Sequence, residues 1–562
     1  MGVTLSRQQE ELRRKIRAYA EEKLAPIAFK LDEDNEFPEQ IVRDLAAQGV
    51  FGLPFPKEYG GAGLDTLSYI LAVEELSRVD GGTGTILSAH VSLGSWPIFA
   101  FGTEAQKQKY LKPLASGQSL GAFGLTEENA GSDAGKTETT AVLDGDHYIL
   151  NGAKIFITNA DRADFYVVFA VTAPGIGTKG ISAFIVEKGW KGFTFGTHYK
   201  KMGIRSSATA ELQFHDVMVP RENLLGAEGQ GFRIAMQTLE GGRIGIAAQA
   251  LGIAQGAYEK ALHYAKERVQ FGKPIGAQQA VAFKLADMAT KIQAARLMVY
   301  HAAGLKDRHE PYGIDASMAK QYASDICLEV VNDAVQIYGG SGFIKGFDVE
   351  RMYRDAKICT IYEGTNEIQR LIISSAILGK PRKKEEKPAA PAPSQPTVAG
   401  QTGKRLGIVI SAGSAAEKVA ELLRRFPAEK LRGQPPKADT AISEADRAVS
   451  VGRGLKEEGD LEMIRTLAGE MGAVVGCSRP VAEGRGWFPL DRFVGISGQK
   501  FKGSLYLALG ISGKIQHLRG IAGAGTIIAV NSDPQAPIFP NADYGIVGDL
   551  YEIVPLLIEA LK

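Results

Sequence analysis

Residues 381–403 read PRKKEEKPAAPAPSQPTVAGQTG, and this stretch decides how the 562-residue chain divides. It holds five prolines and a cluster of charges, and it has no apolar periodicity. Because proline fixes φ and lacks an N–H donor, such a stretch builds neither helix nor sheet. The alternative is a long surface loop, which is uncommon inside compact domains. We therefore predict a semi-rigid tether between two folded parts.

Before the tether, the residue pattern changes twice. Residues 1–120 show the helical spacing of apolar residues, as in LSYILAVEELSRV. Residues 121–230 contain short β-branched and aromatic runs, such as ADFYVVFAV and ISAFIVEK, broken by Gly, Asp or Pro. Residues 231–380 return to long Ala-rich helical segments. The pattern predicts a helical domain, a β domain and a helical bundle.

After the tether, residues 404–562 alternate apolar runs with helical stretches. RLGIVI, GAVVGCS, RFVGIS, LYLALGI and TIIAVN are the candidate strands. AEKVAELLRRF, DLEMIRTLAGEM and IQHLRGI are the candidate helices. Continuous apolar strands that alternate with helices indicate a parallel sheet covered on both faces. We expect a separate α/β domain here.

Charge and cysteine content exclude several classes of protein. The 65 Lys and Arg residues balance 64 Asp and Glu residues, which argues against a nucleic-acid binder. Cys327, Cys359 and Cys477 are far apart, so neither a disulfide framework nor a metal site is expected. The first residues lack an apolar signal-peptide core, and no apolar run approaches the roughly 18 residues of a membrane span. These features favour a cytoplasmic protein without a membrane span.

One carboxylate stands in a segment suited to chemistry, IYEGTNEIQR at 361–370. Glycine after Glu363 would let a ligand approach closely, and the carboxylate could then act as a base. Taken alone, this motif is better explained by a solvated surface glutamate. Three further segments accompany it in order: LTEENAGSD at 125–133, RVQFGK at 268–273 and QIYGG at 336–340.

Together these segments resemble the acyl-CoA dehydrogenase family, over nearly all of residues 5–380, and most closely its short-chain (butyryl-CoA) branch. The resemblance implies a helical domain, a β-barrel-like domain and a four-helix bundle. It also implies that Glu363 is the catalytic base, which removes the α-proton of an acyl-CoA thioester while a β-hydride passes to a flavin. Some branches of the family place the base just before the residue that matches Arg243. Here that position is Gly242, so Glu363 has no rival.

The resemblance also implies binding residues. FAD contacts on the side of the base are Phe123, Leu125, Thr126, Gly131, Ser132, Phe156, Ile157, Thr158, Thr365 and Glu367. Further FAD contacts are Arg268, Phe271, Gln278, Gln336, Ile337, Gly339 and Gly340, of which Arg268 and residues 336–340 would reach across a dimer interface. Substrate contacts are Ser132, Glu240, Arg243 and Gly364. Glu240 stands where the family usually has aspartate.

The last domain carries a strand, a Gly-Ser-Gly turn and a helix in ALGISGKIQH, residues 508–517. This order directs backbone N–H groups at an anion, although a turn without ligand is an equal alternative. The GxGxxG fingerprint of NAD-binding proteins is absent. With GRGL at 452–455, CSRP at 477–480 and VGISG at 494–498, the segment resembles the C-terminal FAD domain of the electron-transfer flavoprotein alpha subunit. The implied FAD contacts are Arg453, Ser478, Arg479, Gly495, Ser497, Ser512, Gly513, Ile515, Gln516, His517, Asn531, Asp549 and Leu550, with Arg479 and His517 as cationic donors.

The two resemblances imply a fusion enzyme with two FAD per chain. It would convert a short-chain acyl-CoA to the enoyl-CoA and pass the electrons to the tethered flavin domain. As a flexible coil, the 23-residue tether would span about 25–30 Å. The expected assembly is a homotetramer or homodimer, and an electron-transfer flavoprotein beta subunit is a possible partner. Two alternatives stay open: an enoyl-CoA reductase that runs in the opposite direction, and a C-terminal domain that only docks a flavoprotein partner.

Overall fold

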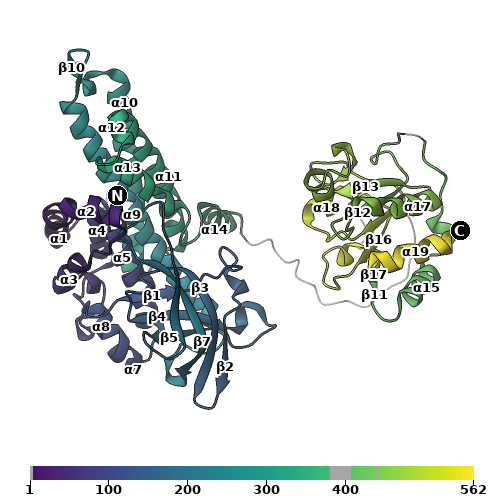
Figure 1. Cartoon of the computed structure of the whole chain (residues 1–562), viewed down its shortest axis with the longest axis horizontal. Coiled ribbons are helices and arrows are strands. Elements are labelled where there is room, and N and C mark those ends of the chain that lie inside the picture. The colour runs from purple at the N-terminus through teal and green to yellow at the C-terminus, as the bar shows by residue number, and fades with distance from the viewer. Residues whose placement is uncertain (1–3, 380–404, 406, 438) are drawn as a thin grey trace, which may run out of the picture. The chain divides into compact units, whose positions relative to one another are not determined.

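The computed structural model describes residues 4–379, 405, 407–437 and 439–562. Its contacts divide the chain into two compact units, residues 1–387 and 388–562, and each unit is described by itself (Figure 1). The predicted tether at 381–403 lies outside the described residues.

The first unit begins with short helices that surround two fully buried ones. Ser6 caps the first helix and forms a reciprocal capping box with Gln9. Asp65 and Asp80 cap the buried helices α4 and α5 by accepting hydrogen bonds from Ser68 N and Thr83 N. The helices are α1 (Arg7–Tyr19), α2 (Ala25–Asp34), α3 (Glu39–Ala47), α4 (Thr66–Ser77), α5 (Gly81–Ser88), α6 (Trp96–Phe101), α7 (Glu104–Gln106) and α8 (Lys112–Ala115), with a π-helical segment at Ala89–Ser95 after α5.

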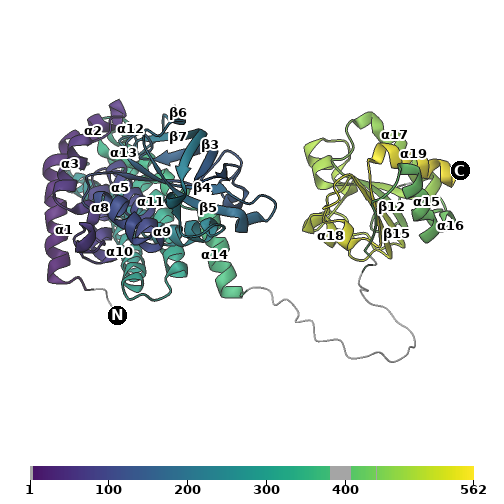
Figure 2. The ribbon, with the colours of Figure 1, turned by 90° about the horizontal axis from the view of Figure 1, so that it is seen from below.

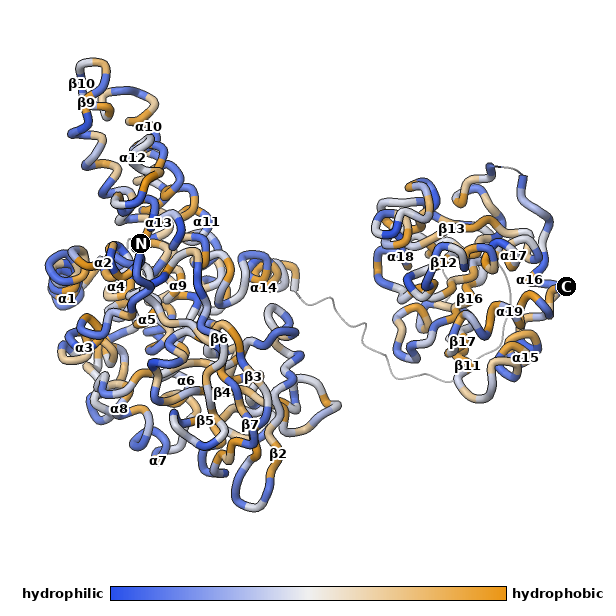
Figure 3. Tube along the Cα trace, in the orientation of Figure 1, coloured by the Kyte–Doolittle hydropathy of each residue, from blue (hydrophilic) through white to orange (hydrophobic). Residues whose placement is uncertain are grey.

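A sheet follows in the order β6-β7-β3-β2-β4-β5-β8, with β1 paired to β4. Most neighbours are antiparallel, but β1 and β2 run parallel to β4. The central strands β4 and β5 are almost wholly buried and hydrophobic, as Figure 3 shows along their traces. The strands are β1 (Gly121–Gly124), β2 (Thr140–Asp144), β3 (His147–Thr158), β4 (Phe165–Val171), β5 (Ile181–Glu187), β6 (Phe193–His198), β7 (Thr209–Pro220) and β8 (Leu224–Leu225).

Three long helices then form the bundle, and a two-stranded hairpin of β9 and β10 lies at one end of it (Figure 1). The elements are α9 (Gly231–Glu267), β9 (Val269–Gln270), β10 (Lys273–Pro274), α10 (Gln279–Asp307), α11 (Gly313–Tyr338), α12 (Gly340–Phe343), α13 (Asp348–Ala356) and α14 (Asn366–Leu378). Between α13 and α14 lies the segment that carries Glu363.

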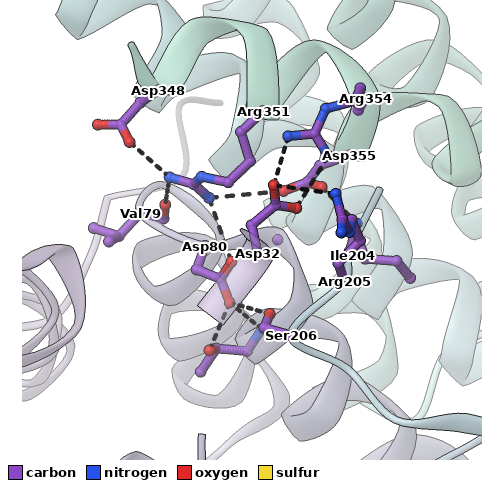
Figure 4. A network of polar contacts seen from close by, with 12 residues as sticks. Asp32, Val79, Asp80, Ile204, Arg205, Ser206, Asp348, Arg351, Arg354 and Asp355 are labelled. Atoms are coloured by element: carbon purple, nitrogen blue, oxygen red, sulfur yellow. Dashed lines mark hydrogen bonds and ion pairs between the residues drawn. The ribbon is translucent and has the colours of Figure 1, made fainter. Parts of the chain in front are cut away.

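A buried ionic network ties α13 to the two preceding parts of this unit (Figure 4). Arg351 Nη1 on α13 lies 3.3 Å from Asp80 Oδ1 at the start of α5. Asp80 also accepts a hydrogen bond of 2.7 Å from Ser206 Oγ, just before β7. Asp355, at the end of α13, accepts one from Ile204 N. The network therefore fixes the element from which the Glu363 segment departs.

The second unit is a parallel sheet in the order β11-β17-β16-β15-β12-β13-β14. Along β15, Leu505, Leu507 and Leu509 join one hydrophobic cluster while Tyr506 and Ala508 join another. The sheet is thus covered on both faces, and Figure 2 shows helices on either side of it. The elements are β11 (Ile408–Ile410), α15 (Ala415–Arg425), α16 (Ala428–Leu431), β12 (Arg447–Val451), α17 (Leu461–Met471), β13 (Val474–Ser478), β14 (Phe493–Val494), β15 (Leu505–Leu509), α18 (Ile515–Gly520), β16 (Thr526–Asn531), β17 (Tyr544–Val547) and α19 (Leu550–Leu561).

The predicted fold class is confirmed: a helical part, a sheet and a helical bundle, then a parallel α/β sheet. Among the described residues, no helix combines the length and apolar character that a membrane crossing requires.

Candidate functional site

A cavity of about 200 Å³ lies where the three parts of the first unit meet. Most of the predicted residues near the base line it, although they come from distant parts of the sequence. They are Phe123, Leu125, Thr126, Gly131, Ser132, Phe156, Ile157, Thr158, Arg243, Glu363 and Gly364. Sequence reasoning did not single out the apolar wall or the polar neighbours Thr85 and Tyr362. The remaining lining residues are Ala89, Leu93, Ala134, Met236, Leu239, Ile246 and Ile368.

Glu363 occupies a strained turn. Its φ of 52° and the φ of 88° at Gly364 put two consecutive residues in the left-handed region, which is costly for a non-glycine residue and is found mainly at functional sites. The carboxylate lies against Gly242, where an added Cβ would come 1.9 Å from Glu363 Oε2. Gly242 on α9 therefore makes room for the carboxylate.

Burial governs the charge of Glu363. Its Oε2 atom is buried and has no hydrogen-bond partner among the described residues. Desolvation raises the pKa of Glu363 to about 8, and the positive charges of Arg243 and Lys320 limit that rise. The Arg243 side chain is itself buried, which lowers its pKa, and its Nε atom has no partner in the described part of the chain. A base and a cation thus face the cavity with unused hydrogen-bonding capacity.

A buried ion pair that sequence reasoning missed supports the 125–132 loop. Lys154 on β3 is fully buried, and its Nζ lies 2.5 Å from Glu127 Oε1 and 3.2 Å from Leu125 O. Glu127 also accepts a hydrogen bond from Thr139 N. The sequence does show a lysine inside the segment that forms β3. Because a lysine is rarely buried without a partner, that residue is the signal that points to an ion pair.

Phe156, also on the cavity wall, has a φ of 58° and a side chain that is 60% exposed. A strained, exposed aromatic residue beside a cavity indicates a surface that is reserved for a ligand.

The other predicted FAD contacts of this unit lie away from the cavity. Phe271, which is 94% exposed, and Arg268 belong to the β9–β10 region at the end of the bundle. Residues 336–340 end α11 and begin α12. Within one chain the structure does not bring these two groups to the cavity, and their proposed role at a neighbouring chain stays a prediction. Gln278 lies at the start of α10, with the first group in sequence.

Three more predicted residues lie close to the cavity without lining it. Thr365 caps α14 by accepting a hydrogen bond from Ile368 N, and Glu367 is exposed in the first turn of that helix. Glu240 precedes Arg243 on α9, and burial raises its pKa.

The second unit holds a cavity of about 530 Å³ at the carboxyl ends of β12, β13, β14 and β15. Loops that follow parallel strands meet at this edge, which is the usual place for a ligand in such a sheet. Predicted residues that line it are Arg453, Ser478, Arg479, Gly495, Ser497, Ser512, Gly513, Gln516 and His517. Gly510 and Gly513 have positive φ values of 60° and 82°, which shape the turn after β15.

The structure corrects the charge expected at His517. Burial lowers its pKa to about 4, so the ring is neutral at pH 7. Nε2 lies 2.9 Å from Tyr506 OH, while the buried Nδ1 has no partner among the described residues. Arg479 is the exposed cation of the pair, 2.7 Å from Glu483. His517 can therefore exchange a hydrogen bond but does not supply charge.

The remaining predicted contacts of this unit do not line its cavity. Ile515 is 66% exposed, whereas Asn531 donates to Ile511 O over 2.9 Å. Asp549 caps α19, and Leu550 is buried. Through this hydrogen bond to Ile511, Asn531 holds the turn that follows β15.

Among the described residues of either unit, no group of three or more His, Cys, Asp or Glu side chains is arranged so that it could hold a metal ion.

Comparison with known proteins places both units in families. The N-terminal, middle and C-terminal domain models of acyl-CoA dehydrogenase match residues 6–118, 122–217 and 229–378. The electron transfer flavoprotein FAD-binding domain matches residues 441–522.

The first unit is similar to whole proteins. A short-chain-specific acyl-CoA dehydrogenase of Clostridium acetobutylicum is 56% identical over 377 residues, which are 67% of this chain and 100% of that protein. A caffeyl-CoA reductase–Etf complex subunit of Acetobacterium woodii is 49% identical over 67% of this chain and 99% of its own length. The structure of butyryl-CoA dehydrogenase from Megasphaera elsdenii is 51% identical, with a TM-score of 0.67 over 67% of this chain and 100% of that one. The chain therefore belongs to the acyl-CoA dehydrogenase family of oxidoreductases, and its second unit carries an electron transfer flavoprotein FAD-binding domain.

Proposed function

We propose that this protein oxidises a short-chain acyl-CoA to the α,β-unsaturated enoyl-CoA and passes the electrons to a second FAD in its own C-terminal unit. The observation that carries the proposal is the Glu363 carboxylate, whose Oε2 atom is buried without a partner among the described residues, in the cavity that gathers the predicted flavin and substrate residues.

The residues around the cavity fit an FAD and an acyl thioester. The buried atoms Arg243 Nε and Glu363 Oε2 lack partners in the described part of the chain, and such groups are rarely left unsatisfied without a ligand. Phe123, Leu125, Thr126, Gly131, Ser132 and Phe156 to Thr158 would hold the flavin. An FAD held by these residues would supply the acceptor for the β-hydride of the substrate.

In the proposed reaction, each of the following cavity residues has a role that its surroundings support. Glu363 takes the α-proton, since a carboxylate whose pKa is raised to about 8 is a stronger base than an exposed one. The backbone N–H of Glu363 has no acceptor among the described residues and would donate to the thioester oxygen. Ser132, Arg243, Gly364 and the neighbouring Glu240 would orient the substrate.

The second cavity supports a second FAD. Its unpartnered His517 Nδ1 and its cations Arg453 and Arg479 suit a ligand with phosphates and ring acceptors. We propose that the remaining predicted residues, Ile515, Asn531, Asp549 and Leu550, act there by direct contact or by holding the loops. The proposed domain limits are 1–120, 121–230, 231–380, 381–403 and 404–562.

Two alternatives are distinguished by experiment. The 49% identity to a caffeyl-CoA reductase–Etf complex subunit favours testing the reverse direction, in which an enoyl-CoA is reduced. The second alternative is a C-terminal unit that only docks a flavoprotein partner, such as a beta subunit. We further propose a cytoplasmic homo-oligomer, in which Arg268 and residues 336–340 complete the FAD site of a neighbouring chain, and Phe271 and Gln278 are proposed as further FAD contacts.

The decisive variant is Glu363→Gln. Gln has nearly the same shape but cannot accept the α-proton, so the purified variant should retain FAD and lose at least about 10³-fold in the rate of flavin reduction by butyryl-CoA. Stopped-flow absorbance measures that rate, and Glu10→Gln, which changes an exposed carboxylate in the first turn of α1, serves as a comparison. Reduction of Glu363→Gln at the wild-type rate would show that another group is the base.

A further inference from the structure

The turn that carries Glu363 is held by its carbonyl groups. Gln369 Nε2 donates to Glu363 O at 3.2 Å and to Gly364 O at 2.8 Å. Lys320 Nζ, from α11, donates to the same Gly364 O at 2.8 Å. Both side chains are fully buried, so the two left-handed residues are fixed from one side by amide and ammonium donors.

The other side of the turn is free to act on a ligand. Within the described residues, neither Glu363 N nor Gly364 N donates a hydrogen bond. Glu363 Oε2 is likewise without a partner there. Holding the carbonyls therefore leaves the N–H donors and the carboxylate as the groups available to the cavity.

Lys320 is itself held in place. Its Nζ also donates to Asn366 Oδ1 at 2.9 Å, and Asn366 donates to Asp325 Oδ1 at 2.6 Å. Lys320 thus connects α11 to the first turn of α14 across the Glu363 segment. Such a support restricts the carboxylate to one position without touching substrate.

Charge is the second contribution of Lys320, and it is present below the pKa of this lysine, which burial lowers to about 8. Its ammonium and the Arg243 guanidinium are the two cations that lower the pKa of Glu363 against desolvation. Tyr69 from α4 and Tyr362 from the same segment also face Glu363 electrostatically. Cys359 and Asp325 are the remaining ionisable neighbours of Lys320.

We propose that Lys320 is a positioning residue of the dehydrogenase site: with Gln369 it fixes the Glu363–Gly364 turn, and its charge favours the ionised carboxylate that takes the proton. This inference rests on the proposed function, because it assigns Lys320 a role through the base.

Lys320→Met is a tolerable test because each acceptor keeps one donor. Gly364 O retains the bond from Gln369, and Ser324 Oγ, which lies 3.1 Å from Asn366 Oδ1, is within reach as a donor. Methionine also fills a similar apolar volume. We expect the variant to fold and to keep its FAD.

The measurement is the rate of FAD reduction by butyryl-CoA between pH 6 and 10 in the full-length holoenzyme. In Lys320→Met, the pH midpoint of the rate should move upward by about one unit and the rate at pH 7 should fall roughly 10- to 100-fold. In Gln369→Met, which removes the amide donors but no charge, the rate should fall about tenfold at every pH with an unchanged midpoint. Lys320→Arg should restore the midpoint even if the rate stays low.

Lys306→Met is the matched control. Burial lowers the pKa of Lys306, on α10, to about 8, as it does for Lys320, but no contact of Lys306 among the described residues reaches the 363–364 turn. Its variant should keep the wild-type profile. A wild-type pH midpoint in Lys320→Met would overturn the proposal. A loss of rate in Lys320→Met with no shift of the pH midpoint, unchanged in Lys320→Arg, would overturn it too. If Glu363→Gln still reduces FAD, the proposed function fails instead, whatever Lys320→Met does.

Discussion

At the scale of single residues, the site combines groups that are costly to hold. Glu363 is buried without a hydrogen-bond partner for Oε2 among the described residues, and it adopts a left-handed φ. Neither feature could be predicted from the sequence, because they depend on which helices surround the segment. The identity of the base could be predicted only because the surrounding motif resembles a family. In the sequence, Gly242 shows only that this position holds no rival base. The structure adds that Gly242 makes room for the Glu363 carboxylate.

The raised pKa of Glu363 makes a prediction about stability. Between its ordinary pKa of 4.5 and its folded value of about 8, the native state binds more protons than the unfolded state. Its contribution therefore becomes less favourable as pH rises through this window. Glu363→Gln removes that cost and should stabilise the ligand-free protein by about 1–3 kcal/mol at pH 8.5. Thermal unfolding at pH 4 and pH 8.5 checks this, since the gain should nearly vanish at pH 4, which is below both pKa values.

A second residue-scale prediction concerns Gly242. A Cβ there would lie 1.9 Å from Glu363 Oε2, so Gly242→Ala must displace the carboxylate. We expect the rate of FAD reduction by butyryl-CoA to fall roughly 10- to 100-fold, because small displacements of a base are costly. Gly469→Ala on α17 is the control, since no heavy atom lies within 4 Å of its added Cβ. An unchanged rate in Gly242→Ala would mean that the carboxylate does not work from this position.

At the scale of elements, apolar periodicity predicts the helices and strands well, but it does not predict the polar contacts that connect them. The buried strand β15 follows directly from its continuous apolar run, and the long helix α9 follows from the helical spacing of its apolar residues. The Glu127–Lys154 pair and the network around Arg351 unite residues far apart in sequence, so local spacing carries no signal for them. The network around Arg351 links the helical parts to the segment before β7, the Glu127–Lys154 pair lies within the β part, and both supplement one apolar core shared by all three parts.

The network at α13 predicts a large loss of stability on truncation. Arg351 is 2% exposed and contacts Asp80, Asp348 and Asp355. Arg351→Met would leave several buried carboxylates without their cation, which should cost about 3–5 kcal/mol. Denaturant-induced unfolding of the first unit measures this loss of stability. Arg7→Met, which removes an exposed arginine of the same unit 2.8 Å from Glu11, should cost less than about 1 kcal/mol. Equal effects would contradict the structural role of the network.

At the scale of the whole molecule, composition and pattern indicated two folded parts, and the structure forms two compact units. The sheet order of the second unit could not be read from the sequence, because it depends on which strands pair. Once β12, β13, β14 and β15 are neighbours, their following loops must meet at one edge. That single topological fact explains why residues from 453 to 517 share a cavity.

The two cavities predict two FAD per chain in the purified protein, counted by flavin absorbance against protein concentration. Gly513→Ala should reduce the count to one, because Gly513 has a φ of 82° and its added Cβ would lie 2.3 Å from Ile538 N. Flavin reduction by butyryl-CoA at the first site should persist, since that cavity is built entirely from the first unit. Gly459→Ala, where the added Cβ meets no heavy atom within 4 Å, should keep two FAD. A wild-type count of one, unaffected by Gly513→Ala, would favour the docking role of the second unit over electron transfer.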